Sequence, residues 1–102
     1  SFEWINADDK DRSIYSYVRK SENGRNNILV VLNMTPMERK DYQLGVDKKK
    51  KYKLLLNSDD VDFGGNGGTI PKEITAKAVK CDNKPYSLTF DLPAYGAALF
   101  LF

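Results

Sequence analysis

Acidic residues make up the first group that could do chemistry. Asp8, Asp9 and Asp11 lie within four residues of one another, beside Lys10 and Arg12. A retaining glycosidase needs two carboxyl groups ~5 Å apart. Aspartates that alternate with cations are more typical of a solvated turn. We therefore predict no catalytic residue in this cluster.

A second acidic group, with Asp60 and Asp62, resembles a calcium loop at first sight. Such a loop needs oxygen ligands at alternate positions, glycine at the sixth and glutamate at the twelfth. Counting from Asp60, the sixth residue is Gly65, but the fifth is Gly64 and the twelfth is Pro71. The pattern fails, and we predict no metal site.

Cofactor and nucleophile motifs are also incomplete. Gly65 to Thr69 starts a dinucleotide-binding fingerprint, but Ile70 occupies the third glycine position. The sequence contains no histidine, so it lacks the commonest general base and zinc ligand. Cys81 is the single cysteine, and we assign it a structural or incidental role. We predict no catalytic, cofactor-binding or metal residue in this chain, and no cofactor.

Composition limits the class of protein. A chain of 102 residues with 41% hydrophobic and 29% charged residues is expected to fold as one soluble domain. The net charge of +2 is spread along the chain, which argues against a nucleic-acid partner. One cysteine excludes an internal disulfide and favours the cytoplasm. No segment approaches the ~20 apolar residues of a membrane span, so we predict no membrane association.

Short apolar runs separated by turn signals predict an all-β, antiparallel fold without long helices. Asn23-Gly24 is expected to form a type I′ hairpin turn. Lys48 to Lys51 is expected to form a solvent-exposed turn. Ile28 to Met34 is apolar on both faces, which favours a central strand lying between two layers. The closing strand must be covered. The expected strands are 13–20, 28–34, 41–46, 52–56, 74–81 (where a helix is also compatible), 87–92 and 97–102, with a loop over 57–68.

Several segments together resemble one known family. They are SFEWIN at 1–6, LNMTP at 32–36, LNSD at 56–59, FGGNG at 63–67 and LPAYGAA at 92–98. In this order and spacing they resemble the C-terminal all-β domain of bacterial 1,4-α-glucan (glycogen) branching enzymes, in the α-amylase superfamily. The lysines at 48–51 stand where that family usually has glycine and proline, and residues 69–84 match only loosely.

The resemblance implies an antiparallel β-sandwich of about eight strands. Residues 1–102 would form a single module of a larger glycosyltransferase of glycogen biosynthesis. That parent cuts an α-1,4-glucan through a covalent intermediate and transfers the piece to a 6-hydroxyl, using paired carboxylates in a (β/α)₈ barrel. No catalytic residue carries over to this chain. Its implied partners are the barrel of the same chain and, through the parent, glycogen.

The apolar start of the chain is the candidate interface. Because Phe2, Trp4 and Ile5 place large apolar side chains there, we predict that they pack against the absent barrel. The domain is then structural and inactive by itself. An autonomous carbohydrate-binding module, in which Trp4 or neighbouring aromatic rings meet sugar, is the alternative. A general protein-interaction domain is a third possibility.

Overall fold

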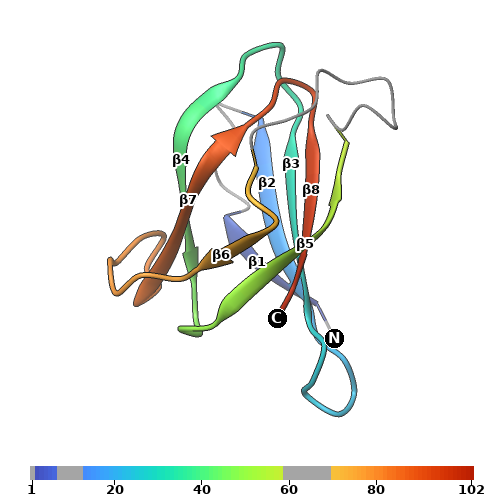
Figure 1. Ribbon diagram of the computed structural model, residues 1–102, viewed down its shortest axis with the longest axis vertical. Helices are drawn as coiled ribbons and strands as arrows, with labels where there is room; N and C mark the ends of the chain where they lie inside the picture. The colour runs from blue at the N-terminus through green and yellow to red at the C-terminus, as the bar shows by residue number, and fades with distance from the viewer. Residues whose placement is uncertain (1, 7–12, 59–69) are drawn as a thin grey trace.

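The computed structural model describes the backbone of residues 2–6 and all atoms of residues 13–58 and 70–102. These described ranges form eight β-strands and no helix, so none of their segments is a helix that could span a membrane. The prediction of an all-β fold is confirmed. The strands are β1 Phe2–Asn6, β2 Ile14–Arg19, β3 Ile28–Asn33, β4 Arg39–Val46, β5 Lys51–Asn57, β6 Glu73–Thr75, β7 Tyr86–Leu92 and β8 Ala97–Leu101 (Figure 1).

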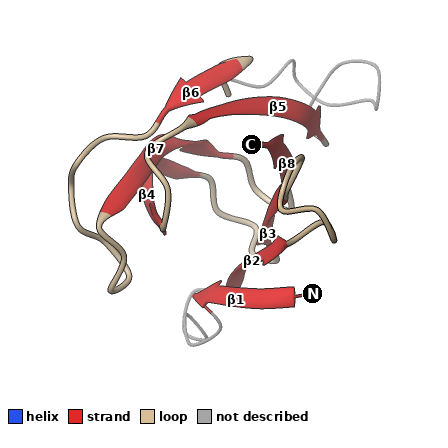
Figure 2. Cartoon of the chain, turned by 90° about the horizontal axis from the view of Figure 1, so that it is seen from below, coloured by secondary structure: helices blue, strands red, loops and turns tan. Residues whose placement is uncertain are grey.

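The strands form a sandwich of two antiparallel sheets. The larger sheet has six strands in the order β1-β2-β3-β8-β5-β6, and the smaller sheet pairs β4 with β7. Figure 2 shows the larger sheet as an arc, with β1 and β6 at its two ends and the β4–β7 pair facing its inner side. The predicted antiparallel β-sandwich is therefore confirmed.

The core lies between the two sheets. In β2, β3, β7 and β8, alternate residues point inward, as the period of two predicts. The Phe90 and Phe100 rings join the two sheets, with centroids 5.4 Å apart. The buried core residues are Ile14, Leu29, Val31, Tyr42, Leu44, Val46, Tyr52, Ile70, Ala76, Leu88, Phe90, Leu92, Ala98 and Phe100.

The predicted centre of the large sheet is correct. β3 lies between β2 and β8, and β8 lies between β3 and β5, so the closing strand is covered on both sides. Leu29 and Val31 are fully buried in the core. Val30, between them, is also buried, at 6% exposure, but on the opposite face of the sheet. The strand is thus apolar on both faces, as the sequence indicates.

The β2–β3 hairpin is confirmed, but the predicted type I′ turn is wrong. Such a turn needs positive φ at both central residues, whereas φ is positive at Gly24 (71°) and Asn26 (55°) and not at Asn23. Instead, Asn23 Oδ1 accepts a hydrogen bond of 2.9 Å from the backbone N of Arg25. This side-chain turn, of the kind that asparagine favours, holds the tip of the hairpin.

The predicted alternation of Tyr52, Leu54 and Leu56 fails at its last residue. Tyr52 is 1% exposed and Leu54 packs on the core. A register shift between Leu54 and Leu56 then turns Leu56 to the opposite face, where it is 36% exposed. A bulge adds one residue to one strand of a pair, and nothing in an all-leucine run signals its position.

The strand predicted over 74–81 is mostly wrong. β6 ends at Thr75, and Lys77 then exchanges two backbone hydrogen bonds with Ser87, of 2.9 and 3.0 Å. The chain therefore leaves the large sheet to meet β7. It reverses through Asp82 and Asn83, which have positive φ. The loop predicted over 57–68 is placed one residue too early at its start, because Asn57 still belongs to β5. Most of that loop lies outside the described residues.

Candidate functional site

The outer face of the six-stranded sheet carries an apolar surface over β2, β3, β8 and the end of β5. Cross-strand partners point to the same face of a sheet. Tyr17 pairs with Val30, Val30 with Leu99, and Leu99 with Leu56, so these four residues form one row across β2, β3, β8 and β5. None of the four belongs to the core cluster between the sheets.

A second row extends this surface. Tyr15 pairs with Leu32, and Leu32 with Ala97. All three are half-buried, and Leu55 beside the first row is 49% exposed. We call residues Tyr15, Tyr17, Val30, Leu32, Leu56, Ala97 and Leu99 the outer apolar face.

The small sheet has a different outer surface. Gln43 and Thr89, which pair across β4 and β7, are polar and exposed. Over β4 lies the turn at Asp82, whose Oδ2 accepts a 2.9 Å hydrogen bond from Gly45 N. Within residues 13–58 and 70–102, the apolar outer surface therefore lies on the large sheet, over β2, β3, β8 and the end of β5.

The candidate interface residues lie on the edge of this large sheet. Phe2 and Trp4 are paired through their backbones with Arg19 and Tyr17. Ile5 falls at a register shift between Trp4 and Asn6. Their side chains lie outside the described residues, as do the acidic groups at 8–11 and 60–62. The role of these three residues stays a prediction.

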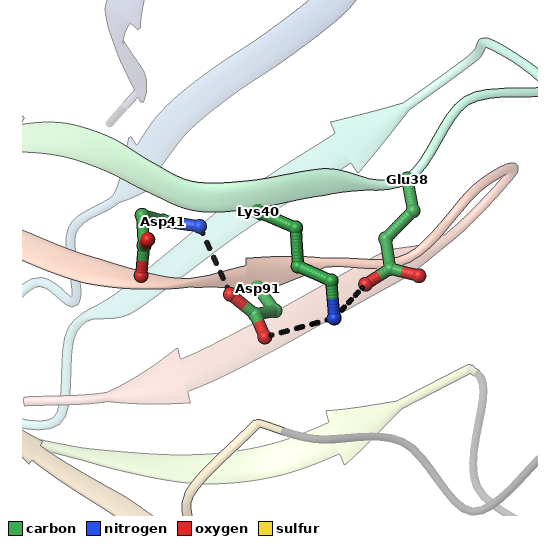
Figure 3. Close-up of polar contacts among 4 residues, drawn as sticks. All are labelled: Glu38, Lys40, Asp41 and Asp91. Carbon is green, nitrogen blue, oxygen red and sulfur yellow. Dashed lines mark hydrogen bonds and ion pairs between the residues drawn. The ribbon is translucent and has the colours of Figure 1, made fainter.

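The carboxylates of Glu38 and Asp91 are engaged in structural contacts. Figure 3 shows Lys40 Nζ between Glu38 Oε1, at 2.8 Å, and Asp91 Oδ2, at 3.6 Å. Asp91 also accepts a 2.9 Å hydrogen bond from the backbone N of Asp41, at the register shift in β4. The hydrogen bond to Glu38 and its charge, aided by Asp91, raise the pKa of Lys40. This cluster holds β4 on β7 rather than forming an acid and nucleophile pair.

Cys81 is not placed for nucleophilic chemistry. Burial, and then the charge of Asp82, raise the pKa of its thiol to about 11, so the thiol is protonated at neutral pH. Across 13–58 and 70–102, no three His, Cys, Asp or Glu side chains gather as a metal site.

Asn33 is a structural residue whose role the sequence did not indicate. It is 1% exposed, and its Nδ2 donates to the carbonyls of Met37 and Pro93, at 2.9 and 3.0 Å. Its Oδ1 accepts from the N and Oγ1 of Thr35, at 3.0 and 2.7 Å. Every donor and acceptor of this buried amide is used. In the sequence, Asn33 stands out only as part of the LNMTP segment that resembles the family. The segment by itself does not show that its asparagine is buried and hydrogen-bonded.

The comparison with protein families decides what this fold is. Residues 4–102 match the family described as "Alpha amylase, C-terminal all-beta domain". The chain belongs to this family. The resemblance drawn from the sequence is thereby confirmed, and the chain is the all-β part of such a protein rather than its catalytic part.

Several relatives in this family are branching enzymes. The chain is 54% identical over 101 residues to a "1,4-alpha-glucan branching enzyme GlgB" of Butyrivibrio fibrisolvens. It is 36% identical over 99 residues to "GlgB 1" of Clostridium perfringens strain SM101, and 35% identical over 99 residues to a GlgB of Halothermothrix orenii. These matches cover 99%, 97% and 97% of this chain, but only 16%, 15% and 16% of the relatives. Most of each relative therefore lies outside the region matched here.

Proposed function

We propose that this chain is the C-terminal domain of a 1,4-α-glucan branching enzyme that forms α-1,6 branches in cytoplasmic glycogen. The observation that carries the proposal is the 54% identity, over 99% of the chain, to a protein of that name. The family match over residues 4–102 supports the same assignment.

The proposed role of the domain itself is structural. We infer that its outer apolar face packs against the catalytic barrel of the same polypeptide. The inference is supported by the asymmetry of the sandwich, because only the large sheet is apolar on both sides. Leu56, at 36% exposure, and Leu55 beside it, at 49%, leave part of this face uncovered in the chain, as expected of a surface that a second layer would cover. The match covers only 16% of the Butyrivibrio fibrisolvens relative, so a protein of that length contains further domains that could form this second layer.

The catalytic chemistry is assigned to the barrel and not to this domain. Cleavage and transfer with retention need two carboxyl groups ~5 Å apart. The described carboxylates of Glu38 and Asp91 are bound to Lys40 instead. The domain contributes by covering a barrel surface that would otherwise be an exposed apolar patch.

Branching by the full-length protein that carries this chain is the direct test. Incubated with amylose, that protein should produce new α-1,6 linkages, visible as anomeric proton signals and as chains released by a debranching enzyme. The 102-residue chain alone should produce none. Full-length protein that makes no α-1,6 linkage, or an isolated chain that makes them, would contradict the proposal.

Alanine substitutions at Phe2, Trp4 and Ile5 test the candidate interface. A residue that packs on the barrel should destabilise the full-length protein and leave the isolated chain unchanged, as measured by thermal unfolding of both. Equal effects in the two proteins would exclude an interface role. Strong retardation of the isolated chain in glycogen-containing gels, lost in Trp4→Ala, would instead favour the carbohydrate-binding module.

A further inference from the structure

A pocket opens at one end of the sandwich, away from the outer apolar face. It has a volume of about 260 Å³ and lies between the β2–β3 hairpin, the β4–β5 turn and Phe102. In Figure 1 these three segments lie together at the lower end of the molecule. The volume is near the lower limit of ligand pockets, ~300 Å³, so it suits about one ring with its substituents.

Apolar side chains form the floor of this pocket. The rings of Tyr52 and Phe102 pack together with centroids 4.7 Å apart. Tyr52 is 1% exposed, so the accessible apolar surface comes from the half-buried Phe102 and Val18. The floor is therefore a small apolar platform and not a deep hydrophobic cavity.

Hydrogen bonds fix the shape of the pocket. The backbone N of Phe102 donates to Asn27 O at 3.0 Å, and the backbone N of Asn27 donates to Phe102 O at 2.9 Å. Asn27 Oδ1 accepts from Ser21 N at 3.1 Å, and Tyr52 Oη donates to Lys48 O at 2.8 Å. These contacts tie the hairpin and the β4–β5 turn to the end of the chain, so a ligand would find the pocket already formed.

The rim carries charges of both signs. Lys20 and Lys48 are its cations, and Glu22 and Asp47 its anions. A phosphate would meet two carboxylates, and a cation would meet two ammonium groups. A neutral ligand rich in hydroxyl groups can instead donate to the carboxylates and accept from the ammonium groups. Asp47 Oδ2 accepts from Lys84 Nζ at 3.1 Å, which orients this carboxylate.

We propose that this pocket binds one glucosyl unit of an α-glucan chain. The C–H face of the pyranose lies on Phe102 and Val18, and its hydroxyl groups contact the charged rim. The choice of α-glucan rests on the proposed function, whereas the preference for a neutral, hydroxyl-rich ring rests on the pocket itself. The domain then holds a segment of the polymer in addition to its structural role.

Titration of the ¹⁵N-labelled chain with maltoheptaose, followed by NMR, tests this inference. Saturable shifts are expected at the amides of 20–27, 47 and 48. Glu22→Ala, at an exposed rim position, should weaken binding about tenfold. Phe102→Ala should weaken binding at least as much. Because Phe102→Ala also removes the ring contact with Tyr52 and could destabilise the fold, Glu22→Ala is the variant that tests binding independently of folding. Tyr95→Ala, which removes a ring that is 70% exposed outside the pocket, is the matched control and should not change binding.

The outcomes separate this inference from the proposed function. No saturable shift, shifts confined to the outer apolar face, or equal affinity of Glu22→Ala and the unaltered chain would overturn the pocket assignment. If the full-length protein still branches amylose in any of these cases, the proposed function stands. If the full-length protein acts on no α-glucan, the proposed function fails, and the choice of ligand fails with it.

Discussion

Asn33 joins three segments through one side chain: the end of β3, the turn that follows, and the loop before β8. Its amide donates to the carbonyls of Met37 and Pro93 and accepts twice from Thr35. A buried polar group is tolerated when all its hydrogen bonds are made and is costly when they are not. The amide therefore helps to hold the loop before β8 against β3, together with the backbone hydrogen bonds from Asn33 N to Gly96 O, at 2.8 Å, and from Tyr95 N to Thr35 O, at 2.9 Å.

Asn33→Asp should destabilise the domain strongly. The substitution keeps the size of the side chain but replaces the NH₂ donor by an oxygen, so two buried carbonyls lose their donor and face a carboxylate. We expect a loss of about 3 kcal/mol or more in the free energy of unfolding. Urea unfolding at pH 7 measures it, and a loss below about 1 kcal/mol would contradict this account.

Ser16 gives the matched contrast within the same sheet. It is fully buried, and its Oγ has no hydrogen-bond partner among the described residues. Ser16→Ala removes an unsatisfied polar atom without creating a large cavity, so stability should be unchanged or higher. A clear loss of stability would mean that this hydroxyl has a partner.

Tyr52 makes the domain sensitive to alkaline pH. Burial, and then the charge of Asp47, raise the pKa of Tyr52 from 10.0 to about 12. The folded chain thus holds this proton more tightly than the unfolded chain does. The stabilisation that the protonated Tyr52 gives to the fold is therefore complete below pH 10 and is lost between pH 10 and about 12. Melting temperatures from pH 9 to 12 should decline more steeply above pH 10 for the unaltered chain than for Tyr52→Phe. Parallel curves would contradict the assignment.

At the scale of elements, β4 and the turn at 81–84 are in direct contact at Gly45. A Cβ on Gly45 would lie 2.0 Å from the carbonyl oxygen of Cys81. Gly45→Ala must therefore displace the turn, and we expect it to cost about 1–3 kcal/mol. Gly24→Asn is the control, because Gly24 has open space around it and asparagine tolerates its φ of 71°. Chemical unfolding should separate the two variants, and equal stabilities would contradict the close contact.

The sequence predicted the elements that strong periodicity specifies. Alternation at Tyr42, Leu44 and Val46 located β4, and the run over 28–34 located β3 as the central strand. It did not locate the bulge at Leu56, because three consecutive leucines fit either face of a strand. It also extended β6 too far, because the bridge from Lys77 to Ser87 is a tertiary contact between residues distant in sequence.

The candidate sites were predictable to different degrees. The outer apolar face was indicated by β3, whose apolar residues on both sides require two covering layers. The pocket was not predictable, because its rim combines Glu22 in one hairpin with Asp47 in another turn. Only the register of the folded chain brings these residues together, and local patterns carry no information about it.

At the scale of the whole molecule, the sandwich has one face that is unlike an ordinary protein surface. The outer apolar face runs across β2, β3, β8 and β5, whereas the exposed side of the β4–β7 pair is polar. The chain belongs to the family of α-amylase C-terminal all-β domains, and the match covers only 16% of the Butyrivibrio fibrisolvens relative. The central proposal is that the outer apolar face is the surface by which the domain packs on a catalytic barrel of the same polypeptide.

Leu56→Lys tests this claim most directly. Leu56 is 36% exposed on the outer apolar face, and Val79, at 48% exposure between β6 and β7, provides the control Val79→Lys. Thermal unfolding is compared for both variants in the isolated chain and in the full-length protein. Leu56→Lys should barely change the isolated chain but lower the melting temperature of the full-length protein, where the charge would be buried without a partner. Val79→Lys should change neither. If Leu56→Lys has the same small effect in both proteins, the outer apolar face is not the docking surface.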